Sequence, residues 1–362
     1  MAWDQGTAWT LAVAEAVERY SSAALDATAV RWATAQELGE AALDLTTVPA
    51  CSAVELAHPR CPLSAASPRL PIRWVRGVSL RDLRQVWLPA VMVHIRIPPR
   101  SLGERFWLPV STGCAAHPDL AQALVNAICE VIERDAIALL WLRRLTVPAV
   151  ELDTRLPPLP RHAGRIRVFD ATTDVGIPVL FAVDRAPGAS EVCTLVCGSS
   201  ALDPRRAAEK LLAEAVLYRR AMERPVGIPA DPDEFTQPVH GARYMSHPAR
   251  APCFSFLLET PARKCLSDLE HLATGSPGGD LAVLLDRLGA LGMNAYAADL
   301  TTDEARRAGL HVVRVIVPEL QPLTFRLRAR YLGHRRLSDA PARMGYPARP
   351  EEEMNPWPQP FG

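Results

Sequence analysis

Lysine is nearly absent from this 362-residue sequence, and so is the lysine-bearing loop that binds phosphate in many nucleotide-binding proteins. Only Lys210 and Lys264 occur, and every other basic residue counted as Lys or Arg is arginine. No Gly-x4-Gly-Lys-Ser/Thr motif is present, and neither lysine follows a glycine-rich turn. A nucleotide site in this chain must therefore bind phosphate through arginine, backbone amides or a metal ion.

Several other features are absent, and each absence excludes a class of protein. The eight cysteines include no Cys-x-x-Cys pair, so a zinc site is not expected. Without an N-terminal leader they indicate reduced thiols in a cytoplasmic protein. No uncharged apolar run reaches about 18 residues, so no membrane span is expected. Forty basic residues balance forty acidic ones, which argues against nucleic acid or a membrane surface as partner.

The expected fold is mixed α/β (α+β), with layered sheet and helices around a large core, because 49% of the residues are hydrophobic. Apolar periodicity predicts helices over residues 7–26, 33–44, 118–144, 203–222 and 280–291, and a short helix before residue 311. Strands are predicted over 72–76, 86–95, 165–169, 179–183, 192–196, 294–299 and 311–317 and after residue 251, with an irregular loop over 47–71. Residues 1–348 are expected to form one domain and residues 349–362 an extended proline-rich tail, for which disorder is the alternative.

A Glu-x-x-Glu-Arg pattern occurs twice, once with Glu15 and Glu18 and once with Glu130 and Glu133. Two glutamates three residues apart share one face of a helix. The second pair lies in a segment that is apolar almost all round, so it is predicted to be buried and to need cations. Magnesium takes oxygen ligands and bridges carboxylates to phosphate oxygens, so these four glutamates are candidates to hold ATP through Mg²⁺.

Arginines would then contact the phosphates directly. The candidates are Arg19, Arg134, Arg143 or Arg144, and Arg219 on the helix predicted over residues 203–222.

Two other kinds of site have weaker support in the sequence. A di-iron site needs Glu-x-x-His motifs on helices, but neither repeated motif has a histidine, and Glu55 and His58, which have the spacing, lie beside Pro59 in the predicted loop. A hydrolase site stays open, although no Gly-x-Ser-x-Gly elbow is present. His117 is either a general base or a loop residue, and the second role is favoured because a lone histidine lacks a partner.

These motifs resemble those of the YcaO family, ATP-dependent enzymes that modify peptide backbone amides. The resemblance is strongest from Ser111 to Ala136, and further matches at 15–21, 72–77, 88–90, 208–219 and 313–318 extend it over nearly the whole chain. It implies an ATP site between carboxylate-bearing helices, in which the four glutamates hold Mg²⁺ and the phosphates. The other residues that it assigns to the nucleotide are Asn126, Arg219 and either Arg143 or Arg144.

The tail is similar to the Pro-x-Pro-x-Pro terminus of the azoline-forming members, which build thiazole/oxazole-modified peptides. Pro356, Pro358, Pro360 and the terminal carboxylate of Gly362 would then belong to the active site. The implied reaction is cyclodehydration, in which a Cys, Ser or Thr side chain attacks the preceding amide carbonyl and ATP phosphorylates the resulting oxyanion. The alternatives are a degenerate scaffold that binds partner or peptide without ATP turnover, and a thioamide-forming enzyme.

The resemblance also carries expectations about the N-terminus and about partners. Fourteen residues precede Glu15, and Asp4-Gln5-Gly6 stands where the family has a Gly-Lys-Gly-like segment, so the N-terminal part of the domain is expected to be shortened. Thr112 replaces an expected asparagine. The implied partners are a precursor peptide, a ThiF-like protein that binds its leader, and a flavin-dependent azoline dehydrogenase. The oligomeric state stays open, with a homodimer as one option.

Overall fold

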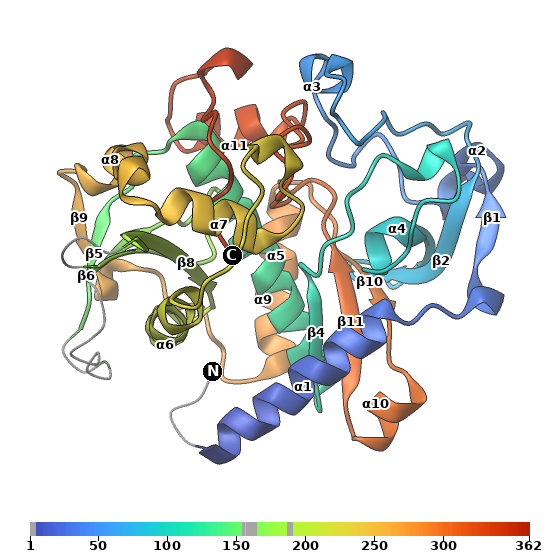
Figure 1. Ribbon diagram of the computed structural model, residues 1–362. Coiled ribbons are helices and arrows are strands. Elements are labelled where there is room, and N and C mark those ends of the chain that lie inside the picture. The colour runs from blue at the N-terminus through green and yellow to red at the C-terminus, as the bar shows by residue number, and fades with distance from the viewer. Residues whose placement is uncertain (1–4, 154–155, 157–164, 187–190) are drawn as a thin grey trace.

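A computed structural model describes residues 5–153, 156, 165–186 and 191–362, and it has the mixed α+β architecture expected from the sequence (Figure 1). The first sheet has the order β1-β2-β10-β11-β4, with β3 also paired to β2, and all these pairs are antiparallel. Its strands are β1 (Arg31–Ala33), β2 (Ile72–Ser79), β3 (Gln85–Pro89), β4 (Cys114–His117), β10 (Tyr296–Asp299) and β11 (His311–Ile316).

The second sheet has the order β8-β7-β6-β5-β9, in which the β5–β9 pair is parallel and the others are antiparallel. Its strands are β5 (Ala149–Glu151), β6 (Arg165–Asp170), β7 (Val179–Arg185), β8 (Thr194–Ser200) and β9 (Arg263–Cys265). The α-helices in the described residues are α1 (Gln5–Ala23), α2 (Ala35–Leu38), α3 (Ala53–Ala57), α4 (Ala90–Val93), α5 (Leu120–Arg143), α6 (Pro204–Met222), α7 (Pro238–Ser246), α8 (Ser255–Leu258), α9 (Pro277–Ala290), α10 (Asp303–Arg307) and α11 (Arg336–Arg343).

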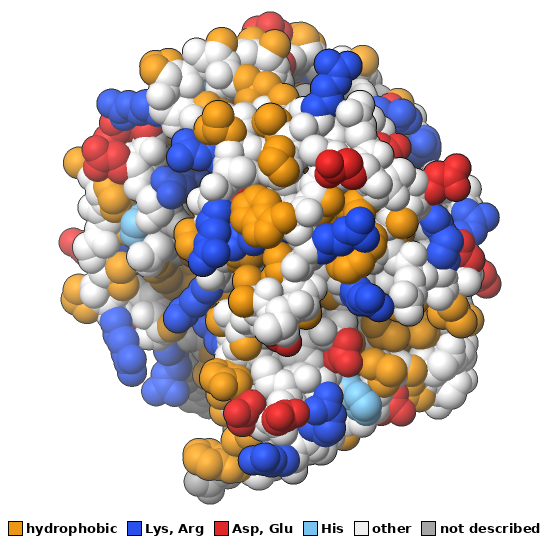
Figure 2. Space-filling model, turned by 90° about the vertical axis from the view of Figure 1, so that its right-hand side faces the viewer, with side chains coloured by type: hydrophobic (Ala, Val, Ile, Leu, Met, Phe, Trp, Pro, Cys, Tyr) orange, Lys and Arg blue, Asp and Glu red, His pale blue; other side chains and the backbone are white. Residues whose placement is uncertain are grey.

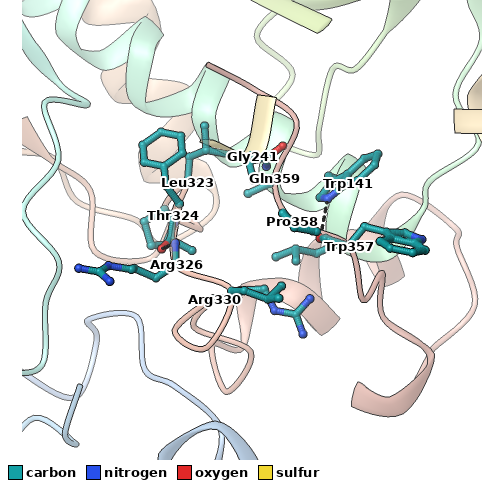
Figure 3. A pocket seen from close by; sticks show the side chains of 14 residues that line it. Trp141, Gly241, Leu323, Thr324, Arg326, Arg330, Trp357, Pro358 and Gln359 are labelled. Atoms are coloured by element: carbon teal, nitrogen blue, oxygen red, sulfur yellow. Dashed lines mark hydrogen bonds between the residues drawn. The ribbon is translucent and has the colours of Figure 1, made fainter. Parts of the chain in front are cut away.

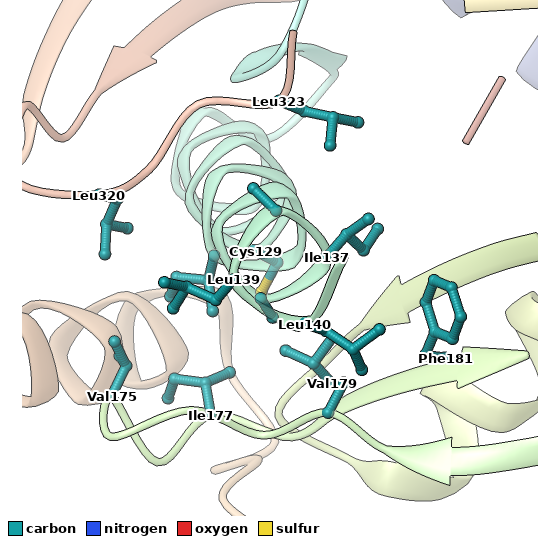
Figure 4. Close-up of a cluster of buried hydrophobic side chains, with 14 of the residues drawn as sticks. Cys129, Ile137, Leu139, Leu140, Val175, Ile177, Val179, Phe181, Leu320 and Leu323 are labelled. Atoms are coloured by element: carbon teal, nitrogen blue, oxygen red, sulfur yellow. The ribbon is translucent and has the colours of Figure 1, made fainter. Parts of the chain in front are cut away.

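Helix α5 is the centre of the fold because it packs against β4 and β11 of one sheet and against β7 and β8 of the other. Most of the apolar side chains around this helix are buried, and Figure 4 shows Ile137 and Leu140 facing Val179 and Phe181 of β7. Each such side chain contributes roughly 1.5–3 kcal/mol when it is fully buried. The prediction that this helix is buried is confirmed, and it begins after Asp119, whose side chain accepts the backbone N–H of Gln122.

Several predicted elements were wrong in type. Residues 33–44 are not one helix, because Gly39 has a positive φ of 56° and ends α2 after four residues. The predicted loop 47–71 contains α3, which starts at a capping box between Ser52 and Glu55. The strand predicted over 86–95 ends at Pro89 and continues as α4. Residues 251–258 form helical turns, and the strand predicted after residue 251 is β9, at Arg263–Cys265.

The tail forms one 3-10 turn at Glu351–Glu353, and the residues after this turn are docked on the protein. Asn355 is fully buried, and its backbone N–H donates to the carbonyl of Leu142 at the end of α5, 2.9 Å away. The indole N–H of Trp141 donates to the carbonyl of Trp357 at 3.3 Å, and both residues border the small pocket in Figure 3. Arg330 donates to the carbonyl of Asn355 at 2.6 Å. These backbone contacts fix the path of the tail along the end of α5.

The surface carries charges of both signs. Figure 2 shows acidic and basic side chains interspersed over the face of the molecule that lies at the right of Figure 1. Among the described residues, every helix is too short or too polar to cross a membrane.

Candidate functional site

A cavity of about 630 Å³ lies between α1, α5 and α6, beside the start of β4. Six carboxylate side chains and three basic side chains line it, so the lining carries an excess of negative charge. The carboxylates are Glu18, Glu130, Glu133, Asp203, Glu214 and Asp280, and the basic residues are Arg134, Arg206 and Lys210. A cavity with this charge balance favours cations, and it would repel a phosphate ligand that brought no cation with it.

Helix α5 supplies the best-defined carboxylates of the cavity. Glu130 Oε2 accepts the backbone N–H of Gly113 at 3.0 Å, and Glu133 Oε2 accepts the backbone N–H of Ser200 at 3.1 Å. The Arg134 guanidinium lies against both carboxylates, with Nη2 3.4 Å from Glu130 Oε1 and Nε 3.6 Å from Glu133 Oε1. The backbone contacts connect the α5 carboxylates to the ends of both sheets.

Burial makes the ionised forms of these carboxylates costly. The pKa of Glu18 is raised to about 8. Burial is the main cause, and the negative charges of Glu130 and Glu15 add to it. Burial raises the pKa of Glu133 to about 7, although Lys210 and Arg134 oppose the rise. Burial raises the pKa of Glu214 above its ordinary value as well. A bound cation would remove this cost, so the group fits a positively charged ligand.

The carboxylates fit magnesium better than a metal held by protein ligands alone. Among the described residues, no three His, Cys, Asp or Glu side chains converge on one point where they could hold an ion. Magnesium commonly keeps several waters and takes one or two carboxylates together with phosphate oxygens. The residues that would hold it are Glu18, Glu130 and Glu133, with Glu214 facing the same cavity.

The structure separates the first predicted glutamate pair. Glu18 lines the cavity, whereas the carboxylate of Glu15 is bound by Arg19 at 2.6 Å and is mostly exposed. The first half of α1 extends into solvent, since the side chain of Trp9 is 74% exposed. Asn126 lines the cavity as expected, and its Oδ1 accepts the side-chain N–H of Gln122 at 2.9 Å. Asp4, at the start of the predicted lysine-segment equivalent, lies outside the described residues.

The predicted arginines Arg143, Arg144 and Arg219 do not line the cavity. Arg143 is buried at the end of α5 and donates to the carbonyl of Arg349 at 2.6 Å, so it holds the tail. Arg144 caps α5 in a left-handed conformation. The guanidinium of Arg219 is buried in an ion pair with Asp184 of β7. The side chains of Arg143 and Arg219 are thus engaged in contacts within the protein, away from the cavity lining.

The residues Glu55 and His117 also have structural roles in place of catalytic ones. Glu55 is buried, and its carboxylate accepts the backbone N–H groups of Arg330 and Leu332 at 2.6 and 2.7 Å. His117 Nδ1 accepts the backbone N–H of Asp119 at 3.0 Å, which orders the turn before α5. Both observations agree with the structural role that the sequence favours for these residues.

Sequence reasoning missed three residues of α6 that line the cavity. Arg206, Lys210 and Glu214 follow one another at intervals of four, which places them on one face of the helix. Lys210 Nζ lies 4.0 Å from Glu133 Oε2, and this carboxylate is the first cause of the raised pKa of the lysine. The four-residue spacing and the scarcity of lysine were signals that could have found this face.

The end of the tail lies beside the cavity. The Phe361 ring is almost fully buried, and the guanidinium carbon of Arg134 lies 4.4 Å from its centroid. Gly362 is exposed and packs against Tyr218, because a Cβ at position 362 would lie 2.0 Å from the tyrosine hydroxyl. Tyr218 follows Glu214 by one helical turn, so the terminal residue packs against the face of α6 that carries this carboxylate.

The family of the chain follows from comparison with known proteins. The family model described as "YcaO cyclodehydratase, ATP-ad Mg2+-binding" matches residues 4–321, and the chain belongs to this family. ATP and Mg²⁺ are its cofactors. An uncharacterised protein from the tfuA 3′ region of Rhizobium leguminosarum bv. trifolii is 26% identical over 88% of this chain and 75% of its own. An uncharacterised protein of Methanothermobacter thermautotrophicus is 28% identical over 69% of this chain and 66% of its own.

Solved structures share the fold. A heterocyclase in complex with substrate and cofactor has a TM-score of 0.80 and 24% identity, and the match covers 96% of this chain but 48% of that one. YcaO from Methanopyrus kandleri, bound with AMPPCP and Mg²⁺, has a TM-score of 0.64 and 21% identity over 86% and 75% of the two chains. The E. coli microcin synthetase McbBCD complex with pro-MccB17 bound has a TM-score of 0.63 and 17% identity over 97% and 87%. The chain spans about half the length of the heterocyclase chain.

Proposed function

We propose that this chain is an ATP-dependent peptide cyclodehydratase that converts Cys, Ser or Thr residues of a ribosomal precursor peptide to azolines. The observation that carries the proposal is the cavity that Glu18, Glu130 and Glu133 line beside the docked end of the tail. The excess of carboxylates suits a nucleotide that brings Mg²⁺. The terminal residue is exposed to solvent, so a bound peptide substrate could reach it.

The chemistry needs an activated amide oxygen, which is otherwise a poor leaving group. The side-chain sulfur or oxygen of the substrate attacks the preceding carbonyl carbon, and its proton passes to a base. The resulting oxyanion attacks the γ-phosphorus of ATP and ADP leaves; loss of phosphate from the ring carbon, with loss of the amide proton, then gives the C=N bond. Magnesium would neutralise charge on the phosphate oxygens during the transfer.

The residues of this chain would position the reactants. Glu130 and Glu133 are fixed by backbone N–H groups, which pre-orients two carboxylates toward the cavity. The terminal carboxylate of Gly362 is the candidate base, because the docking of Pro358, Pro360 and Phe361, all buried, fixes its place. Pro356 is exposed, and its role would be to keep the segment before them extended.

The proposed partners are a precursor peptide, a ThiF-like protein that binds its leader, and a flavin-dependent dehydrogenase that oxidises the azoline. The similarity to an assembled microcin synthetase with a bound precursor supports a multi-protein reaction.

The test is phosphate release from ATP in the presence of Mg²⁺, precursor peptide and partner protein, with azoline formation followed by mass spectrometry. Glu130→Gln and Glu133→Gln should abolish both signals. Glu209→Gln is the matched control, since Glu209 is a solvent-facing glutamate of α6 that pairs with Arg205 outside the cavity lining. Turnover by the Glu130 and Glu133 variants would contradict the assignment of the site. Calorimetry with ATP and Mg²⁺ separates an enzyme from a degenerate scaffold, which would bind no nucleotide.

A further inference from the structure

Phe361 of the tail contacts Arg134, which lines the carboxylate cavity. The Arg134 guanidinium lies over the Phe361 ring, 4.4 Å from its centroid, and also lies between the carboxylates of Glu130 and Glu133. One face of the guanidinium is therefore covered by the tail, while its edge points toward the two candidate metal ligands.

The carboxylates alone hold Arg134 weakly. The two contacts measure 3.4 and 3.6 Å, which are long for charge-assisted hydrogen bonds, and the buried Nε has no hydrogen-bond partner among the described residues. A guanidinium over an aromatic face gains about 0.5–2 kcal/mol, more when it is desolvated. The ring of Phe361 is thus an additional restraint on the position of this cation.

The Phe361 ring packs in the hydrophobic core of the protein. Phe361 is 1% exposed and belongs to the hydrophobic cluster around α5. A Cβ at Gly198 on β8 would lie 3.5 Å from the Phe361 ring and 2.5 Å from Ile137, so the glycine leaves the space that the ring and Ile137 fill. The ring can reach Arg134 only when the tail is docked.

We propose that Phe361 is a positioning residue, whose ring holds Arg134 between Glu130 and Glu133 and so makes the nucleotide site depend on the docked tail. This inference rests on the proposed function, because it concerns the affinity of the same cavity for Mg²⁺-ATP. It differs from the role of Gly362, since it acts through a side chain and does not require the terminal carboxylate.

The experiment measures Mg²⁺-ATP affinity by calorimetry, without turnover, in full-length variants. Phe361→Leu keeps an apolar side chain but removes the ring, and it should weaken binding by about 2- to 30-fold, the loss that one cation–π contact implies. Phe361→Tyr keeps the ring and should restore affinity. Trp357→Leu is the matched control, because Trp357 makes the same kind of contact with Arg250, at 4.5 Å, and neither residue lines the cavity.

A double-mutant cycle tests whether Phe361 affects Mg²⁺-ATP affinity through Arg134. If Phe361 acts through Arg134, Phe361→Leu should change the affinity far less in an Arg134→Ala background than in the unaltered chain. The melting temperatures of the same variants, measured without ligand, should also show coupling between the two side chains. Equal weakening by Phe361→Leu and Trp357→Leu, or unchanged affinity in Phe361→Leu, would overturn the inference alone. No binding of Mg²⁺-ATP by the unaltered chain would overturn the proposed function and this inference together.

Discussion

The backbone N–H of Gly113 donates to Oε2 of Glu130 across 3.0 Å, which ties the start of β4 to the carboxylate face of α5. Gly113 has a φ of +85°, and a Cβ there would lie 2.3 Å from the carbonyl oxygen of Val315 on β11. No side chain fits this position without movement of one of the two strands. The hydrogen bond to Glu130 therefore depends on glycine.

Gly113→Ala should lower both stability and nucleotide affinity. The left-handed backbone and the clash together should cost at least about 1–3 kcal/mol of unfolding free energy, and displacement of Glu130 should weaken Mg²⁺-ATP binding. Gly309→Ala is the control, because Gly309 also has a positive φ, +71°, but has open space around its Cβ position. That variant should lose about 1–2 kcal/mol and keep its affinity. Chemical denaturation and calorimetry measure the two effects, and equal affinity losses would contradict the role of Gly113.

Glu18 and Glu15 should differ in their importance for nucleotide binding. Glu18 lines the cavity, so Glu18→Gln removes a charge that a cation would contact and should weaken Mg²⁺-ATP binding by about tenfold or more. Glu15 forms an exposed ion pair with Arg19, and Glu15→Gln should change the affinity by no more than about fivefold. Titration calorimetry of the two variants distinguishes them. A larger loss for Glu15→Gln would show that its carboxylate leaves Arg19 for the ligand.

The local patterns predicted the carboxylate helix well because its signals lie within one segment. Glu130 and Glu133 share a helical face, and the apolar residues around them predict a buried helix. Asp203 and the following proline likewise predicted the start of α6, which the structure confirms. The α/β alternation gave the fold class, since layer architecture follows from the order of elements.

Long-range partners explain what the patterns did not predict. Asp184, which is 35 positions earlier than Arg219, binds the Arg219 guanidinium, and Arg219 lies outside the cavity lining. Glu15 and Glu18 have the same spacing as the α5 pair, but α1 extends partly into solvent and Arg19 holds Glu15. The helix expected over residues 33–44 failed because the backbone at Gly39 turns to positive φ, which tertiary packing decides.

Acid should destabilise the protein through its buried histidines. His334 is buried, its Nδ1 lies 3.0 Å from Gln321 Oε1, and burial, aided by Arg336 and Arg335, lowers its pKa from 6.5 to about 4. A depressed pKa means that the unfolded chain binds the proton first, so this stability is present above about pH 6.5 and is lost as the pH falls toward about 4. Burial lowers the pKa of His94 to about 4 as well, and it adds to the same loss.

Thermal unfolding at pH 8 and pH 5 tests this expectation. The melting temperature should fall between the two conditions, and His334→Gln should reduce that fall by several degrees, because glutamine takes up no proton. His311→Gln is the control, since His311 is exposed on β11 and should leave the fall unchanged. An equal fall in all three proteins would mean that His334 does not titrate on unfolding.

One added glycine after Gly362 tests whether the terminal carboxylate takes part in the reaction. The extension moves the carboxylate by up to about 3.6 Å, while Phe361 and Asn355 can stay buried in their seats. Azoline formation should fall about a hundredfold, because small displacements of a reacting group carry penalties of that size. Mg²⁺-ATP affinity and the melting temperature should stay near those of the unaltered chain, and the same glycine added before Met1 is the control. Full azoline formation by the extended chain would remove Gly362 from the mechanism. A thioamide product would replace the azoline assignment altogether, since external sulfide would then be the nucleophile.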